Sequence, residues 1–239
     1  MRDAGRIVSE ILDELEKAVA PGVTTWDLDQ LAEGLIFKKG AKPAFKGYLG
    51  FPCCLCASVN DEVIHGIPSK KRKLKTGDLM KLDFGVVYKG YYGDSARTVP
   101  VGPISSEAQG LIDATRESLY KGIEASVAGN RIGDIGHAVQ RHVEARGFSV
   151  VRDFVGHGVG KKLHEPPQIP NYGESGTGMK LRPGMTIAIE PMVNMGTFKV
   201  EVLDDDWTAV TADHKLSAHF EHTLLITDAE PEILTRPSR

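Results

Sequence analysis

Five side chains stand at positions in this sequence that suit metal binding. Asp83 and Asp94 occupy two neighbouring strand-like segments, Glu190 and Glu221 lie beside apolar runs, and His157 stands between two glycines. A buried carboxylate without a cation costs several kcal/mol, and no Lys or Arg flanks Glu190 closely. Four carboxylates and an imidazole form an oxygen-rich site suited to two divalent ions about 3.5 to 4 Å apart.

Asp83 and Asp94 belong to a predicted β-hairpin whose turn is Lys89-Gly90. In the register that this turn sets, Gly85 faces Asp94 and Asp83 faces Ala96. Side chains two apart on a strand share a face, so the two acids lie diagonally on one face, roughly 7 to 8 Å apart. For this pair alone, the alternative to a metal site is that both acids are simply solvated. The additional acids Glu190 and Glu221 favour the metal site. The opposite face is apolar and predicts a surface that helices cover: Met80, Leu82, Phe84 and Val86.

The segment that ends in Asp83 recurs later in the chain. KLKTGDLMKLD at residues 73 to 83 matches KLRPGMTIAIE at residues 180 to 190, so Asp83 and Glu190 are equivalent positions. Two adjacent copies and one pseudo-symmetric domain both fit a repeat of this length. The acids favour one domain, because only there do the two strand ends meet. We predict a single catalytic domain over residues 1–239, with halves at about residues 1–104 and 105–239.

The elements that position these residues predict an α+β fold. Apolar residues at helical spacing, together with helix-ending Gly and Pro, predict helices over about residues 4–19, 25–40, 105–127 and 132–146. Thr25 is the expected N-cap of the second helix. Alternating or continuous apolar runs predict strands over about residues 54–60, 78–88, 91–100, 185–190, 197–203 and 217–227.

Composition and charge exclude several classes of partner. The chain has 239 residues, 41% of them hydrophobic, and a net charge of −3. This is typical of a globular protein with a sizeable core, and it provides no overall attraction for DNA or an acidic membrane. A solvated loop is the favoured interpretation of the one basic run, and docking to an RNA-rich particle is the alternative. The run consists of Lys70, Lys71, Arg72, Lys73 and Lys75.

The cysteines and the first residues indicate the compartment. Cys53, Cys54 and Cys56 lie too close together to cross-link distant segments, and no further ligands at zinc spacing follow them. The sequence has no apolar run long enough to span a bilayer, and its start, MRDAGRIVSE, lacks the apolar core of a signal peptide. We expect a cytoplasmic protein in a reducing compartment.

The chain contains segments that resemble one enzyme family, the type I methionine aminopeptidases of the pita-bread fold. These segments are NDEVIHGIP at residues 60 to 68, DFGVVYKGYYGDSART at 83 to 98, GHGVGKKLHEPPQIPNYG at 156 to 173, LRPGMTIAIEPM at 181 to 192 and WTAVTADHKLSAHFEHT at 207 to 223. The resemblance covers nearly all of the chain. It implies two pseudo-symmetric halves with a curved antiparallel sheet covered by two helix pairs. It also implies a metallo-exopeptidase that removes the initiator methionine from nascent proteins and peptides with a small second residue.

The resemblance implies that the five metal ligands are Asp83, Asp94, His157, Glu190 and Glu221. In that family Asp94 and Glu221 bridge two divalent ions, Asp83 completes one site, and His157 with Glu190 completes the other. A bridging water becomes hydroxide and attacks the first peptide bond, while the metals polarise its carbonyl and hold the free amine. Glu190 is expected to move the proton to the leaving amine. The ions are Co, Mn, Fe or Zn, and the sequence does not identify the metal used in the cell.

The resemblance also implies which residues contact the substrate. His65 and His164 match the family's two histidines that are not ligands, and they are expected to stabilise the tetrahedral intermediate. An apolar, aromatic pocket with a sulfur neighbour suits a thioether, and ordinary core packing is the alternative, above all for Leu163. Phe45 and Leu163 stand where many relatives have a cysteine and an aromatic ring, which affects the shape of the pocket. The implied substrate-binding residues are Tyr48, Phe51, Cys56, His65, Leu163, His164 and Trp207.

Two rival functions share this fold. A proline-directed peptidase normally carries a large extra N-terminal domain, which this sequence lacks, and a binding protein without catalysis is expected to have lost its ligands. Relatives usually have a short stretch before the segment that matches MRDAGR. Ribosome docking through a zinc-binding or proline-rich extension is therefore not expected, whereas transient ribosome association stays open. Nascent polypeptide N-termini are the expected partners, and the family precedent is a monomer.

Overall fold

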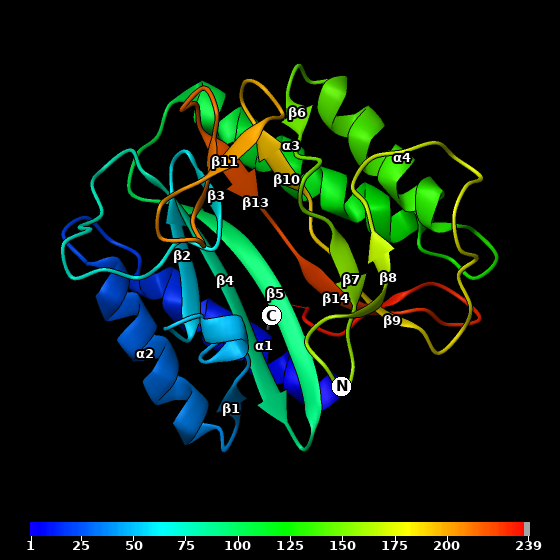
Figure 1. The fold of residues 1–239 in the computed structure, drawn as a ribbon, viewed down its shortest axis with the longest axis horizontal. Coiled ribbons are helices and arrows are strands. Elements are labelled where there is room, and N and C mark those ends of the chain that lie inside the picture. Colours follow the sequence, from blue (N-terminus) through cyan, green and yellow to red (C-terminus); the bar gives the residue numbers. More distant parts are fainter. Residues whose placement is uncertain (237–239) are drawn as a thin grey trace.

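The computed structural model describes residues 1–236. In its first part, helix α1 lies behind a long β-hairpin made of β4 and β5 (Figure 1). The elements up to this hairpin are α1 (Arg2–Ala18), α2 (Thr25–Lys38), β1 (Lys42–Pro43), a 3-10 turn (Tyr48–Gly50), β2 (Leu55–Val59), β3 (Glu62–Ile64), β4 (Leu79–Tyr88) and β5 (Tyr91–Pro100).

The second part again begins with two helices and continues with short strands. One sheet has the order β15-β14-β9-β7-β8, β10 lies between β13 and β6, and β12 lies between β11 and β3. The elements are α3 (Ser106–Ala125), α4 (Ile132–Glu144), β6 (Ser149–Val150), β7 (Gly156–Gly158), β8 (Glu165–Ile169), β9 (Thr186–Ile189), β10 (Met192–Asn194), β11 (Val200–Val202), β12 (Ala209–Thr211), β13 (Ser217–His219), β14 (His222–Leu225) and β15 (Glu232–Ile233). Among residues 1–236, no helix combines the length and the apolar character needed to cross a membrane.

The N-cap of α2 is Thr24, so the prediction of Thr25 was wrong by one residue. The hydroxyl of Thr24 accepts a hydrogen bond from the Asp27 backbone N–H, and the Asp27 carboxylate accepts one from the Thr24 N–H, which forms a capping box. The Thr25 hydroxyl instead accepts the backbone N–H of Ser69 at 2.9 Å. Threonine is a favourable N-cap at either position. The contact of Thr25 with the distant Ser69 leaves Thr24 as the cap.

The β4–β5 hairpin has the predicted register. Gly85 pairs with Asp94 and Asp83 with Ala96, which confirms the expectation that both acids point to one face. Lys89 and Gly90 have φ values of 50° and 81°, as a type I′ two-residue hairpin turn needs at its two central positions. Local turn geometry therefore aligns the two acids before any distant contact is considered.

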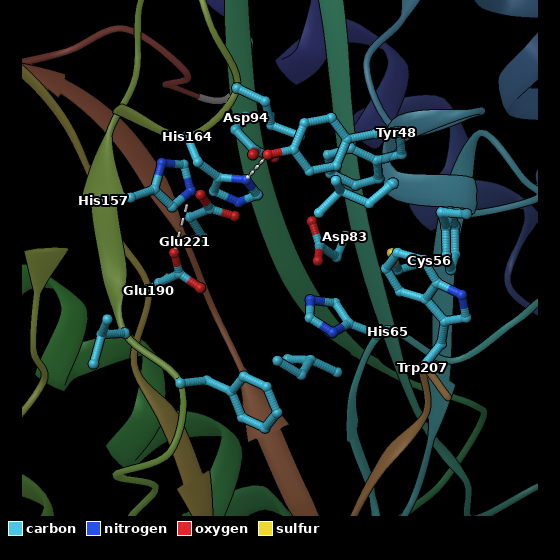
Figure 2. Close-up of a pocket in the computed structure, with 17 residues that line it drawn as sticks. Tyr48, Cys56, His65, Asp83, Asp94, His157, His164, Glu190, Trp207 and Glu221 are labelled. Atoms are coloured by element: carbon cyan, nitrogen blue, oxygen red, sulfur yellow. Dashed lines mark hydrogen bonds and ion pairs between the residues drawn. The ribbon is translucent and has the colours of Figure 1, made fainter. Parts of the chain in front are cut away.

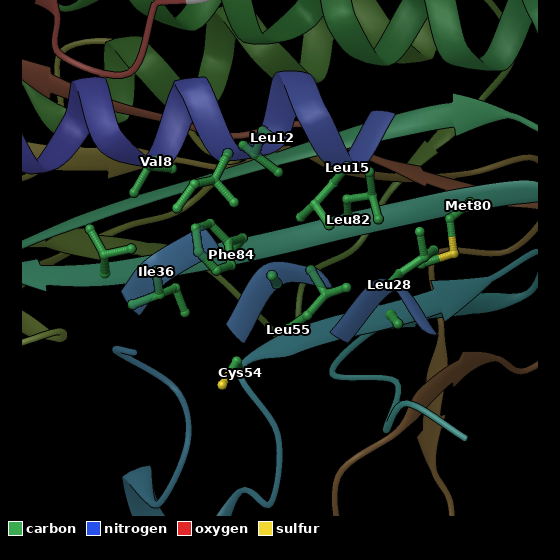
Figure 3. Packing of buried hydrophobic residues seen from close by; sticks show 14 of the residues in the cluster. Val8, Leu12, Leu15, Leu28, Ile36, Cys54, Leu55, Met80, Leu82 and Phe84 are labelled. Atoms are coloured by element: carbon green, nitrogen blue, oxygen red, sulfur yellow. The ribbon is translucent and has the colours of Figure 1, made fainter. Parts of the chain in front are cut away.

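The opposite face of the hairpin packs against the first helix pair, as its apolar pattern predicts. Leu82 and Phe84 are fully buried between α1, which contributes Leu12 and Leu15, and α2, which contributes Ile36 (Figure 3). Burying a side chain of this size contributes about 1.5 to 3 kcal/mol. One face of β4 is thus fixed by the core, and Asp83 has to point away from it.

The strand predicted over residues 217–227 is broken in two. Residues of β13 pair with β10, whereas β14 pairs with β9 in another sheet. Between them, the backbone of Glu221 exchanges N–H and C=O hydrogen bonds with Ala96 of β5. An apolar run does not specify its pairing partner, and the crossing between sheets is what brings Glu221 to the hairpin.

Matched backbone hydrogen bonds relate the two parts of the chain. Gly22 donates to Leu74 and Gly129 to Leu181, and the bridge between Thr24 and Lys73 corresponds to one between Arg131 and Lys180. Each pair differs by the same 107 positions that separate the sequence copies. These bonds support our proposal that one domain contains two copies of a unit, at about residues 1–104 and 105–239, although the last three residues lie outside the described part.

Candidate metal centre and substrate pocket

One cavity of about 220 Å³ is lined by all of the predicted metal ligands. Figure 2 shows His157 and Glu190 on one side of this cavity, with Asp83 and His65 on the other. The structure thus brings together residues that are more than a hundred positions apart in the sequence. The four acids and one histidine that it gathers are Asp83, Asp94, His157, Glu190 and Glu221.

Each ligand candidate is held by a different element. Asp83 lies on β4, Asp94 on β5, Glu190 directly follows β9, and Glu221 lies between β13 and β14. His157 is the central residue of β7. Three of the side chains lie on strands and the other two lie directly beside strands. Because the strand ladders fix these backbones, the five side chains approach one another on preorganised supports.

The glycines beside His157 permit a close backbone approach, as their small size predicts. A Cβ atom on Gly156 would lie 2.3 Å from the carbonyl oxygen of Ala188, and one on Gly158 would lie 2.4 Å from that of Pro166. Neither distance is compatible with a side chain. Neither of these glycines has a positive φ, so the strand uses their small size and not their backbone freedom.

The geometry around His157 suits a metal ligand. Its Nδ1 lies 2.9 Å from the backbone carbonyl oxygen of Gly158, so Nδ1 carries the hydrogen and Nε2 keeps a free lone pair. Nε2 lies 3.5 Å from Glu190 Oε1. Asp94, His157 and Glu221 each offer a ligand atom, and these atoms all lie within 4.8 Å of one another.

The acids are strongly perturbed by burial and by one another. Burial raises the pKa of Asp83 to about 7. Burial also raises the pKa values of Asp94, Glu190 and Glu221 well above the usual carboxyl range, and neighbouring carboxylates raise them further. Burial lowers the pKa of His157 to about 4, which keeps its imidazole neutral and able to bind a cation.

Divalent cations fit this arrangement of donors. Asp94 Oδ1 and Glu221 Oε1 are buried and have no hydrogen-bond partner within the described residues, although buried polar atoms are normally paired. No lysine or arginine of residues 1–236 forms a salt bridge with either carboxylate. Unpaired buried oxygens around a neutral imidazole are what a hard or borderline divalent ion requires.

A metal-induced increase in melting temperature should become larger as the pH rises from about 6 to about 8. The folded-state pKa values of these carboxyls exceed the unfolded ones, so their protonated forms stabilise the metal-free fold at low pH. For Asp83 this stabilisation is lost as the pH rises through about 7. A metal ion displaces their protons, and it competes better when fewer protons are bound. Calorimetry with and without Mn²⁺ measures the difference, in which other titrating groups cancel. A constant or shrinking difference would contradict this interpretation.

The predicted substrate-binding residues line the same cavity. Phe51 and Trp207 form an edge-to-face pair with ring centroids 5.1 Å apart, and buried Cys56 lies directly opposite Asp83 in the β2–β4 register. The apolar part of the cavity is therefore one strand away from the acids. The full predicted set, all of which the cavity brings together, is Tyr48, Phe51, Cys56, His65, Leu163, His164 and Trp207.

The two histidines that are not expected to bind metal lie at opposite sides of the cavity (Figure 2). The His164 ring packs against His157 with centroids 4.3 Å apart, and Tyr48 Oη lies 2.7 Å from His164 Nδ1. His65 packs against Phe154 and Trp207. Burial lowers the pKa of His65 to about 4, so the ring is neutral at physiological pH.

The sequence motifs did not indicate every residue of the site. His219 is buried, with Nε2 4.0 Å from Glu190 Oε2. The available signal was its position two residues before Glu221 in the strand predicted over residues 217–227. Phe45, treated above as a departure from the family, lines the cavity. Further lining residues lie beside the motif histidines or in the 3-10 turn: Leu49, Ile64, Phe154 and Val155.

Comparison with known proteins places this geometry in a family. Residues 1–228 match the model of metallopeptidase family M24. The chain is 57% identical to the methionine aminopeptidase of Clostridium acetobutylicum, over 98% of this chain and 94% of that protein.

Solved structures agree with this match. The crystal structure of methionine aminopeptidase from Thermotoga maritima is similar with a TM-score of 0.97 and 51% identity, over 99% of this chain and 95% of that one. The prolidase of Pyrococcus horikoshii shares the fold alone, with a TM-score of 0.80 at 23% identity, over all of this chain and 61% of that one. These likenesses confirm the expected pita-bread fold. The chain belongs to metallopeptidase family M24 and, within it, to the methionine aminopeptidases.

Proposed function

We propose that this protein removes the N-terminal methionine from proteins and peptides whose second residue is small. The observation that supports this proposal most directly is the shared cavity, in which an apolar, aromatic pocket adjoins a cluster of four carboxylates and a histidine. The pocket suits a methionine side chain, and the adjoining carboxylates suit metal ions next to the scissile bond. Its curated relatives of high identity are named methionine aminopeptidases.

Two divalent metal ions are the proposed cofactors. When bound, such ions would polarise the scissile carbonyl and make water a stronger nucleophile at neutral pH. Co, Mn, Fe and Zn all accept carboxylate and imidazole ligands, so availability decides between them. The residues proposed to hold the ions are Asp83, Asp94, His157, Glu190 and Glu221.

The apolar pocket is proposed to select the first side chain of the substrate. Phe51, Cys56 and Trp207 surround it with aromatic edges and a sulfur atom, which suits an unbranched thioether. The Cys56 thiol stays protonated, because burial raises its pKa well above the usual range. Phe45 and Leu163 are both buried beside this pocket, so these two departures from the family determine its shape.

His65 and His164 are proposed to bind the reacting peptide from opposite sides. Both rings line the cavity, and a neutral imidazole can donate one hydrogen bond to an oxygen that gains negative charge. Glu190 is proposed to accept a proton at its carboxylate and return it to the leaving amine. The raised pKa of Glu190, which burial causes, is consistent with a carboxyl that holds a proton during turnover.

Replacing Tyr48 by Phe should lower kcat about tenfold and leave KM nearly unchanged. The phenol hydroxyl, 2.7 Å from His164 Nδ1, would donate to that nitrogen and leave the hydrogen of His164 on Nε2. Loss of one such bond corresponds to about 1.4 kcal/mol, whereas the Phe ring preserves the pocket lining. Nitrogen-15 NMR of labelled histidine should show an altered His164 tautomer population. An unchanged tautomer with unchanged kcat would contradict the assignment.

Peptide assays distinguish this function from its rivals. Purified protein with added Co²⁺, Mn²⁺ or Fe²⁺ should release Met from Met-Ala-Ser, and a chelator should abolish release. A proline-directed peptidase would instead cleave Ala-Pro-Ser. A binding protein without catalysis would cleave neither peptide and would retain no metal. Absence of methionine release with every divalent metal tested would exclude the proposal.

The substrates in the cell are proposed to be nascent polypeptide N-termini, which would place the protein in the cytoplasm as a monomer that associates transiently with ribosomes. The basic run near Lys70 is consistent with such contacts, although Lys70 itself lies over the Trp26 ring, 5.2 Å from its centroid. Cosedimentation with ribosomes at low and high salt tests this, because binding through phosphate charge weakens steeply with salt.

A further inference from the structure

Lys81 is a fully buried lysine in the middle of the molecule. It lies on β4, two residues before Asp83, and only 1% of its surface is exposed. Its Nζ donates hydrogen bonds to the backbone carbonyls of Asn60, at 2.8 Å, and Ser217, at 3.0 Å. Within the described residues, no carboxylate lies within salt-bridge distance of this ammonium group.

A buried ammonium group is costly, so its retention needs a physical reason. Burial lowers the pKa of Lys81 to about 7, and the more distant carboxylates of Glu62, Asp61 and Asp78 oppose this effect. A Met or Leu side chain would fill similar space on β4 without this cost. Such a residue cannot donate hydrogen bonds to two carbonyl oxygens that belong to different segments.

The first of these segments leads to His65. Asn60 has a φ of 59° and begins the turn before β3, which ends one residue before His65. The Asn60 side chain is fixed as well, because its Oδ1 accepts the Leu79 N–H and its Nδ2 donates to Asp78. The Lys81 contact therefore fixes the start of a short segment whose end carries a substrate-binding histidine.

The second segment leads to Glu221. Ser217 begins β13, and its backbone N–H donates to the same Asn60 carbonyl that accepts from Lys81. β13 packs against β3, β4 and β5, and Figure 1 shows β13 beside β3 above the upper end of β4. Lys81 thus joins β4, which carries Asp83, to the segments that carry His65 and Glu221.

We propose that Lys81 is a positioning residue of the active site, whose ammonium group fixes the Asn60 and Ser217 carbonyls and thereby sets His65 and Glu221 relative to Asp83. This inference rests on the proposed function, because that function assigns His65 to substrate binding and Glu221 to metal binding. The ammonium group touches neither substrate nor metal.

Chemical rescue tests this role. Lys81→Ala removes the head group and leaves a space beside the two carbonyls, which an added ammonium ion can enter. The variant is assayed with Mn²⁺ and Met-Ala-Ser in sodium- and potassium-free buffer, with ammonium chloride or, at equal ionic strength, tetramethylammonium chloride. The matched control is Met80→Ala, which removes the adjacent buried side chain on the opposite, apolar face of β4.

We expect Lys81→Ala to lower kcat by about 10- to 100-fold, the range found when supporting partners of metal ligands are removed. It should also weaken Mn²⁺ binding in calorimetry. Ammonium should restore kcat and Mn²⁺ affinity at least about fivefold, whereas tetramethylammonium is too large to do so. Met80→Ala should lower the melting temperature, keep kcat near the wild-type value and show no response to ammonium.

Wild-type kcat and Mn²⁺ affinity in folded Lys81→Ala would overturn the proposal, and so would a loss that ammonium does not reverse. If Lys81→Ala folds poorly, Lys81→Met preserves the volume and should show the same loss without rescue. A fully active Lys81→Met would also overturn the proposal. If the wild-type protein releases no methionine, the proposed function fails, and the ammonium dependence of Mn²⁺ affinity still decides the role of Lys81.

Discussion

Replacing Asp94 by Asn should lower kcat/KM for Met-Ala-Ser by about a thousandfold or more, equivalent to about 4 kcal/mol of activation free energy. The change keeps the shape of the side chain but replaces one acceptor oxygen by an amide that donates hydrogen bonds. Asp94 lies among the closest ligand atoms of the site, together with His157 and Glu221. Calorimetric titration with Mn²⁺ should show at least one ion bound much more weakly.

The same variant should not be destabilised when metal is absent. Asp94 is buried beside other carboxylates, and its Oδ1 has no partner within the described residues. Removing one of several like charges relieves repulsion, so the metal-free variant should melt at or above the wild-type temperature at pH 8. Asp113→Asn, at a partly exposed position on α3 remote from the cavity, is the matched control and should change neither property. Wild-type Mn²⁺ affinity in Asp94→Asn would contradict its role as a ligand.

Replacing His164 by Ala should lower kcat by about 100- to 1,000-fold while Mn²⁺ affinity changes only a few-fold. Removing one donor to a developing oxyanion has an effect of this size. His164 Nδ1 is engaged by Tyr48, which leaves Nε2 free for the substrate, and the closest group of ligand atoms does not include His164. His65→Ala should show the same separation between kcat and metal affinity.

Steady-state kinetics and calorimetry on the same preparations measure this separation. His137→Ala is the matched control, because His137 is an exposed histidine on α4, and it should behave as wild type. The ring of His164 packs against His157, so a fall in Mn²⁺ affinity as large as the fall in kcat would mean that His164 acts through the ligand. That result would remove it from the group of substrate-binding residues.

The sequence predicted the parts of this site that local geometry controls. The Lys89-Gly90 turn requires positive φ at both positions, and this requirement alone set the register that aligns Asp83 with Asp94. The glycines beside His157 are likewise a local feature, because only residues without a side chain permit the close backbone approach found there. These features depend on a few neighbouring residues, so a pattern of residue types is sufficient to predict them.

The sequence also predicted the type of chemistry, which is metal binding by buried carboxylates. An acid that ends an apolar strand, as Glu190 does, is expensive to bury unless a cation compensates it. Its equivalence with Asp83 in the repeated segment indicated that two such acids meet. Sequence motifs then identified the enzyme family, which the comparisons confirm.

By itself, the sequence determined the hairpin, the residues of the candidate metal site and the family, because short-range backbone geometry and the cost of buried charge depend on residue type. Only the tertiary structure decided which threonine caps α2, where the strand before Glu221 breaks, and which carbonyls Lys81 holds. Each of these depends on a partner far away in the chain: Ser69, β9 and β10, or Ser217. Several partners of similar chemistry compete for such a contact, and packing selects one of them.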